Sequence, residues 1–177
     1  MDAERGRNQT DINIDIEFSD HQNHLRVDHE ALGDLACRVL AREGVLKASV
    51  SIALVDDATI HDLNRLHLGH DWPTDVITFP LSDPGDPLLA GELIVSTEMA
   101  ATTARGADLD PLAELALYVV HGVLHLCGLD DQNALDKAAM RLREAEHLAA
   151  FGWPNTYPLV EPTEPEPQRR ECATCPD

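Results

Sequence analysis

Aromatic side chains are scarce in this sequence of 177 residues, where phenylalanine, tryptophan and tyrosine together account for 4%. The hydrophobic fraction is nevertheless 44%, which is enough for a core of leucine, valine, isoleucine and alanine. Long apolar runs are missing too. None reaches the roughly 18 residues of a membrane span, and residues 1–22 lack the apolar centre of a signal peptide. The length suits one domain, and we expect it in the cytoplasm, away from membranes.

Basic residues are also few. Lysine and arginine number 13 against 32 aspartates and glutamates, which gives a formal net charge of −19 at pH 7. Phosphate binding is normally supported by a basic surface. The composition therefore argues against a general nucleic-acid-binding protein, and we expect no binding to DNA. Any contact with RNA must depend on a local site, because the acidic remainder is typical of a solubilising surface.

Cysteine is limited to Cys37, Cys127, Cys172 and Cys175. In a reducing cytosol these thiols are not expected to form disulfides. Cys37 and Cys127 stand in apolar helical segments, which predicts small, buried hydrophobic side chains. Cys172 and Cys175 offer only two thiolates, whereas structural zinc usually takes four ligands, so we do not expect this pair to bind a metal.

Hydrophobic periodicity predicts a layered α/β or α+β fold, with a mixed sheet of about four strands and about five helices. Strands are predicted at Asn13–Phe18, Lys47–Val55, Val76–Phe79 and Gly91–Val95. Helices are predicted from Asp28 to Gly44, from Asp57 through Leu66, from Ser96 or Thr97 to about Ala104, from Asp110 to Cys127 and from Ala134 to Phe151. We predict one compact domain over residues 11–157, between a disordered N-terminus (1–10) and a disordered tail rich in proline and glutamate (158–177).

Two histidines four residues apart, His121 and His125, lie within the most apolar of these helices. Residues i and i+4 share a helix face, so both imidazoles can reach one ion. A histidine in an apolar helix is most often a core residue with a hydrogen-bond partner. Two imidazoles buried without partners would cost about a few kcal/mol. A shared metal ion supplies a partner for both, which favours a central, buried metal-binding helix.

The residues after the histidines support this interpretation. Gly128 lets the chain turn back, because glycine enters left-handed backbone space at little cost. Asp130 or Asp131 can then return as a third ligand. Two histidines and one carboxylate, with a position left open for water, describe a catalytic zinc site. The same ligands suit iron, nickel or cobalt, so the sequence leaves the metal open.

Gly122 follows the first histidine, at the position where HExxH metalloproteases carry the glutamate that acts as general base. Its presence argues against a peptidase. Zinc-bound water has a pKa of about 7, so the metal alone can generate a nucleophile. Gly122 is explained either by helix packing or by open space beside the metal for a bulky substrate.

The run from His121 to Asp131, HGVLHLCGLDD, resembles the HGxLHLxGYDH signature of the YbeY family of bacterial metal-dependent endoribonucleases. Two further blocks resemble that family in the same order. LN at 63–64 with DWPTDVITFP at 71–80 is similar to its LN…DxPTDVLSFP block, and GELIV at 91–95 is similar to its GDIxI strand. The similarity extends over residues 13–151, and such an ordered set is highly specific.

The resemblance implies a compact α/β fold and one zinc ion. It also implies an endoribonuclease of single-stranded RNA that matures ribosomal RNA at the 3′ end of 16S rRNA and serves ribosome quality control. The implied partners are ribosomal RNA and the small ribosomal subunit or proteins associated with it. By position, His121 and His125 match the first two zinc ligands and are the residues expected to carry catalysis. The third family ligand, a histidine, corresponds to Asp131. Aspartate is shorter, so the loop must come closer or Asp130 must substitute.

Leu68 stands where the family typically carries an arginine thought to engage the RNA phosphate. Fixed positive charge stabilises a phosphoryl transition state, so this departure bears on cleavage and not on the fold. Arg65, His67 and His70 are nearby in sequence, and each is a candidate replacement or an ordinary surface residue.

Other polar residues have simpler explanations. Thr74 and Asp75 precede the third predicted strand beside a proline, where turn or cap hydrogen bonds explain them. The alternative is that they form a wall of the cleft facing the metal. Glu98 and His147 are expected on helix surfaces.

The function predicted from the sequence is zinc-dependent cleavage of single-stranded RNA. A metal-dependent hydrolase of another substrate, such as a peptide, is the first alternative. The second is a non-catalytic, ribosome-associated binding protein with a degenerate site, which the residues at Leu68 and Asp131 favour.

Overall fold

The computed structural model describes residues 12–154 and 156, and within them a four-stranded mixed sheet is combined with five helices. The strands are β1 (Asn13–Asp20), β2 (Lys47–Val55), β3 (Val76–Pro80) and β4 (Leu89–Ser96). The helices are α1 (His29–Arg42), α2 (Asp57–Leu68), α3 (Thr97–Ala107), α4 (Pro111–Leu126) and α5 (Ala134–Ala150). The predicted α/β fold class is confirmed. The segments predicted to be disordered, 1–10 and 158–177, lie outside the described residues, as do Cys172 and Cys175.

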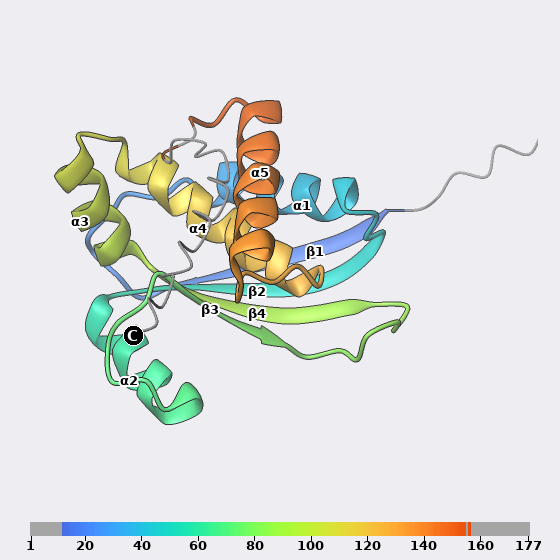
Figure 1. Ribbon diagram of the computed structural model, residues 1–177, viewed down its shortest axis with the longest axis horizontal. Coiled ribbons are helices and arrows are strands. Elements are labelled where there is room, and N and C mark those ends of the chain that lie inside the picture. Colours follow the sequence, from blue (N-terminus) through green and yellow to red (C-terminus); the bar gives the residue numbers. More distant parts are fainter. Residues whose placement is uncertain (1–11, 155, 157–177) are drawn as a thin grey trace, which may run out of the picture.

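The sheet has the strand order β1-β2-β4-β3 (Figure 1). β1 pairs with β2 and β2 with β4 in parallel, and β3 joins the edge of β4 in antiparallel orientation. A parallel pair needs a crossover connection, which α1 supplies between β1 and β2. The antiparallel edge strand brings the loop before β3 back beside the end of β4, where Ser96 N donates to Asp75 O at 2.8 Å.

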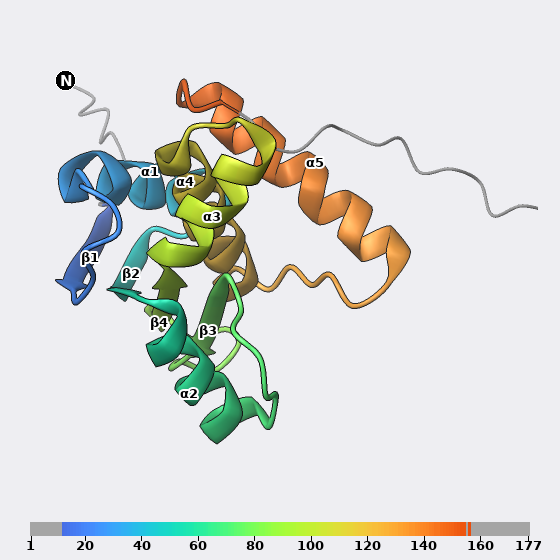
Figure 2. The ribbon, with the colours of Figure 1, turned by 90° about the vertical axis from the view of Figure 1, so that its left-hand side faces the viewer.

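Two hydrophobic cores lie on opposite faces of the sheet. The larger one packs α1 and α4 against it, with fully buried residues such as Leu35, Leu40, Ile52, Leu93 and Leu124. α2 lies on the other side (Figures 1 and 2), over a small cluster made by Val55, Ile60, Ile77 and Ile94. No helix in the described part of the chain is both long and apolar enough to cross a bilayer.

α4 is the central helix, as predicted. It starts at Asp110, whose side chain accepts a hydrogen bond from Leu112 N at 2.9 Å, and proline occupies the first helical position. It contacts α1, α3, α5, β3 and β4. A side chain on Gly122 would meet β4, since an added Cβ would lie 2.9 Å from Leu93 Cδ2. Helix packing therefore explains Gly122, and the hypothesis of open space beside the metal is wrong.

We expect Gly122→Ala to lower the free energy of unfolding by about 1–2 kcal/mol, because overpacking at the buried Leu93 exceeds the helix-propensity gain of alanine over glycine. Gly106→Ala in α3 is the matched control, since nothing lies within 4 Å of its added Cβ. This control should stabilise the protein slightly. Urea unfolding of both variants measures the difference, and a stabilised Gly122→Ala protein would show that the contact is loose.

The placement predicted for His147 is wrong. Its side chain is 1% exposed and lies 2.7 Å from Glu43 Oε1 at the end of α1. His147 follows Glu144 by three residues on α5, so both lie on the face that packs inward. Glu98 is only partly at the surface, because it accepts a hydrogen bond from Asp57 N at 3.1 Å and so links α3 to α2.

Cys37 and Cys127 were predicted to be buried, but both are partly exposed. Both thiols are free. Burial, with the nearby charge of Glu43, raises the pKa of Cys127 to about 12. This thiol therefore stays protonated at neutral pH.

Candidate metal centre

His121 and His125 converge on one point, one turn apart on α4. Their Nε2 atoms lie 3.0 Å apart. The other ring nitrogens are engaged elsewhere: His121 Nδ1 lies 2.6 Å from Glu144 Oε1, and His125 Nδ1 lies 2.9 Å from the Leu129 carbonyl oxygen. A carboxylate and a carbonyl only accept hydrogen bonds, so both Nδ1 atoms donate. In the neutral rings, both Nε2 atoms then carry lone pairs that face each other.

Two lone pairs at this separation repel unless a proton or a metal ion is shared between the two nitrogens, so the pair fits a metal ion when both rings are neutral. Neutral imidazole binds metals through such a nitrogen, with the other nitrogen donating to a carboxylate or carbonyl. His121 and His125 both have this arrangement. The spacing argument from the sequence is thus matched by the orientation of the rings.

Asp131 completes the cluster through the turn at Gly128, whose φ is +92°. Its carboxylate oxygens lie 3.8 Å from His125 Nε2 and 4.0 Å from His121 Nε2. Among the described residues, these three side chains form a group whose ligand atoms lie within 4.8 Å of one another. Asp130 is exposed and accepts a hydrogen bond from Asp131 N at 2.8 Å. The aspartate that faces the histidines is therefore Asp131.

Glu144 contacts the candidate site, although the sequence pattern did not single it out. Its side chain is only 2% exposed, and besides His121 it pairs with Arg141 Nη1 at 3.1 Å. A signal was present: Met140, Glu144 and Leu148 recur every four residues, and the two apolar members face the core. The carboxylate fixes the orientation of the His121 ring, the usual task of a residue that contacts a metal ligand from behind.

The charge around His121 alters its protonation. Burial disfavours the imidazolium and is the largest single effect. The hydrogen bond and charge of Glu144, with the charges of Asp75 and Asp131, outweigh it and raise the pKa of His121 above its ordinary 6.5. The same negative charges favour a bound cation. A metal ion and a proton therefore compete for His121 Nε2.

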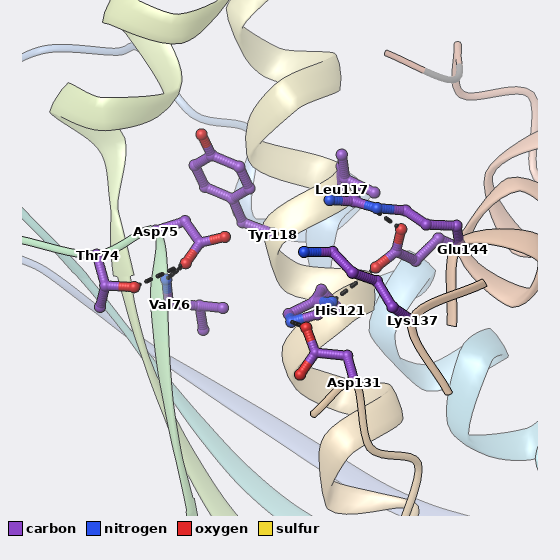
Figure 3. Close-up of a pocket in the computed structure, with 10 residues that line it drawn as sticks. Thr74, Asp75, Val76, Leu117, Tyr118, His121, Asp131, Lys137 and Glu144 are labelled. Atoms are coloured by element: carbon purple, nitrogen blue, oxygen red, sulfur yellow. Dashed lines mark hydrogen bonds and ion pairs between the residues drawn. The ribbon is translucent and has the colours of Figure 1, made fainter. Parts of the chain in front are cut away.

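A cavity of about 340 Å³ opens beside His121 (Figure 3). Thr74 and Asp75 line one side, and Lys137 and Arg141 from α5 contribute to its lining with Asp131. Thr74 Oγ1 and Val76 N both donate to Asp75 Oδ1 at 2.9 Å. The predicted turn hydrogen bonds are confirmed, and the same residues line the cavity beside His121. That this wall faces a metal stays a prediction.

The cations of this cavity come from α5 and not from the region of Leu68. Leu68 is 51% exposed at the end of α2, and Arg65 pairs with Asp62 at 2.8 Å on the same surface. His67 and His70 pack on aromatic rings. None of these candidates lines the cavity. Lys137 and Arg141 were missed because the alternating charges of their helix resemble any solvated helix face.

A second cavity of about 710 Å³ borders His125. Its lining comes from the turn at residues 44–47, from the β3–β4 loop with the adjoining strand ends, and from residues 125–128 at the end of α4. His121 thus lines the first cavity and His125 the second.

Comparison with known proteins gives a consistent family match. A family model described as Endoribonuclease YbeY matches residues 16–152. A protein of Rhodopirellula baltica, named Endoribonuclease YbeY, is 45% identical over 131 residues, which cover 72% of this chain and 66% of that protein. One of the same name from Syntrophotalea carbinolica is 37% identical, covering 76% of this chain and 93% of the relative. The solution structure of TM1509 from Thermotoga maritima superposes with a TM-score of 0.54 at 27% identity, covering 78% of this chain and 91% of that one.

Proposed function

Since the chain belongs to the endoribonuclease YbeY family, we propose that it hydrolyses phosphodiester bonds in single-stranded RNA, using one zinc ion held by His121, His125 and Asp131. The observation that carries this proposal is the opposed pair of Nε2 atoms, 3.0 Å apart, whose rings are fixed from behind by Glu144 and Leu129. The motif resemblance extends the proposal to cytoplasmic maturation of ribosomal RNA at the 3′ end of 16S rRNA and to ribosome quality control, with the small ribosomal subunit or its associated proteins as partner.

In this proposal, the residues around the site have separate roles in binding the metal and the phosphate. When bound, zinc would supply a Lewis acid for a phosphate oxygen and an acidified water. Lys137 and Arg141 bring positive charge to the cavity beside His121, which attracts the phosphate and stabilises charge that develops on it. Glu144 keeps His121 in the tautomer whose Nε2 is free to bind. The strongly acidic remainder repels RNA, so recognition must depend on this local site.

Removal and return of the metal tests this proposal. Zinc-loaded protein should cleave a short, end-labelled single-stranded RNA, lose that activity with a chelator and regain it with stoichiometric zinc. A duplex of the same sequence and an unstructured peptide serve as comparison substrates. Peptide turnover without RNA turnover would favour the other hydrolase, and ribosomal-subunit binding without cleavage would favour the binding protein. Activity restored by iron, nickel or cobalt but not by zinc would show that the enzyme uses a metal other than the proposed zinc.

A further inference from the structure

Exposed apolar side chains gather at the last turn of α2 and in the loop that follows it. Leu66, Leu68 and Trp72 are 75%, 51% and 58% exposed, within seven residues of chain. The indole of Trp72 is stacked on the imidazole of His70, with ring centroids 4.8 Å apart and planes 10° from parallel. In a chain with so few aromatic residues, this tryptophan contributes little to the core and presents much of its surface to solvent.

The backbone that carries this stack is held firmly. Asn64, 2% exposed, donates from Nδ2 to the Trp72 carbonyl oxygen at 2.8 Å. His61 Nε2 lies 2.9 Å from Asp71 Oδ1 in the preceding residue. Gly69 ends α2 in the left-handed conformation, with φ of +72°, and turns the chain toward the stack. These bonds hold the backbone at Trp72, and the indole itself stacks on His70 and is not packed in the core.

The stack lies close in sequence to a residue that lines the cavity beside His121. Only Pro73 separates Trp72 from Thr74, which lines the cavity beside His121. Two residues span at most about 7 Å. Figure 2 shows the loop after α2 returning toward β3, and Figure 3 places Thr74 and Asp75 across from His121. An RNA strand whose phosphate occupied this cavity would place a neighbouring nucleotide near the backbone of Trp72.

We propose that the Trp72–His70 stack is a binding platform for one nucleobase of the single-stranded RNA, beside the scissile phosphate. This inference rests on the proposed function. Stacking on an aromatic face is open to every base and does not depend on the charge of the protein. It suits a chain of net charge −19, where attraction to the RNA backbone is confined to a few cations. It also needs a base that is not paired, which suits the single-stranded RNA of the proposed function.

Tryptophan fluorescence tests the contact directly. The sequence contains two tryptophans, Trp72 and Trp153, so Trp153→Phe leaves one reporter at the proposed platform. The zinc-loaded Trp153→Phe protein should show quenched emission when mixed with a short single-stranded RNA, read before cleavage proceeds. The same RNA annealed into a duplex should quench much less. Unchanged emission at RNA concentrations above KM would overturn the inference.

Steady-state cleavage gives an independent measurement. A base held away from the reacting atoms contributes equally to ground-state and transition-state binding. Trp72→Ala is therefore expected to raise KM about tenfold with kcat within about twofold, and Trp72→Phe to restore most of the loss. Leu142→Ala, which removes an apolar side chain 53% exposed on α5, is the control for lost surface and should leave both constants unchanged. A KM unchanged in Trp72→Ala would contradict the platform.

The two measurements separate failure of the platform from failure of the proposed activity. RNA cleavage without quenching, and without an effect of Trp72→Ala, retains the enzyme and removes the platform. Quenching by single-stranded RNA in a protein that cleaves none retains the platform and removes the activity. Neither quenching nor cleavage overturns both.

Discussion

Replacing His125 with alanine is expected to abolish RNA cleavage, with a loss on the order of 10³-fold or more, because the metal loses one of two fixed imidazole ligands. The expected zinc content after dialysis falls from one ion per chain toward none. The side chain is 24% exposed and alanine favours helices, so the variant should fold. Cleavage of labelled single-stranded RNA, zinc content and thermal unfolding are measured on the same preparation.

His29→Ala is the matched control for this change. His29 also lies on a helix and pairs with a carboxylate, Asp20, at 2.8 Å, but it does not line either cavity. Its cleavage rate should stay within about twofold of wild type. Activity that survives in His125→Ala belongs to a contaminant or to chemistry that does not use this site.

Glu144→Gln is expected to weaken zinc binding by about 10- to 100-fold, with a comparable loss of cleavage at limiting zinc. Glutamine keeps the size of the side chain but removes the negative charge that holds His121. The substitution is also expected to change the pH dependence of zinc affinity. In wild type, the raised pKa of His121 lets the proton compete with zinc from higher pH. Loss of the charge should lower this pKa, so the fall of zinc affinity on acidification begins at lower pH in the variant.

Competition with a chromophoric chelator across pH measures both effects. Glu146→Gln is the control on the same helix, because Glu146 is 43% exposed and pairs with Arg143 at 2.9 Å, away from His121. It should leave zinc affinity unchanged. Equal affinities for Glu144→Gln and wild type would show that His121 is oriented without its carboxylate partner.

The features that the sequence predicted well are those encoded over short distances. Strand alternation and helix caps gave all nine elements of the described region, with end points shifted by a few residues. The i, i+4 spacing identified His121 and His125, and Gly128 correctly implied the turn that returns Asp131. Each of these depends on backbone periodicity or on the conformational freedom of glycine.

The features that could not be predicted from the sequence depend on how elements distant in the chain pack together. Glu144 meets His121 across 23 residues, and His147 meets Glu43 across 104. Lys137 and Arg141 face the cavity only because α5 crosses α4 at that level. A charge at an inward-facing helix position is a usable signal, but its partner comes from tertiary packing, which no local pattern specifies.

The hydrogen bond between Glu144 and His121 also connects α5 to the proposed metal site. Glu144 belongs to α5, and His121 to α4, so the ring that receives the ion is held in place by a helix that must itself be docked. Thermodynamic linkage is reciprocal. If the docked α5 strengthens zinc binding through this bond, bound zinc stabilises the docked α5 by the same free energy. In the proposed zinc site, a change that displaces α5 would therefore weaken zinc binding without altering His121, His125 or Asp131.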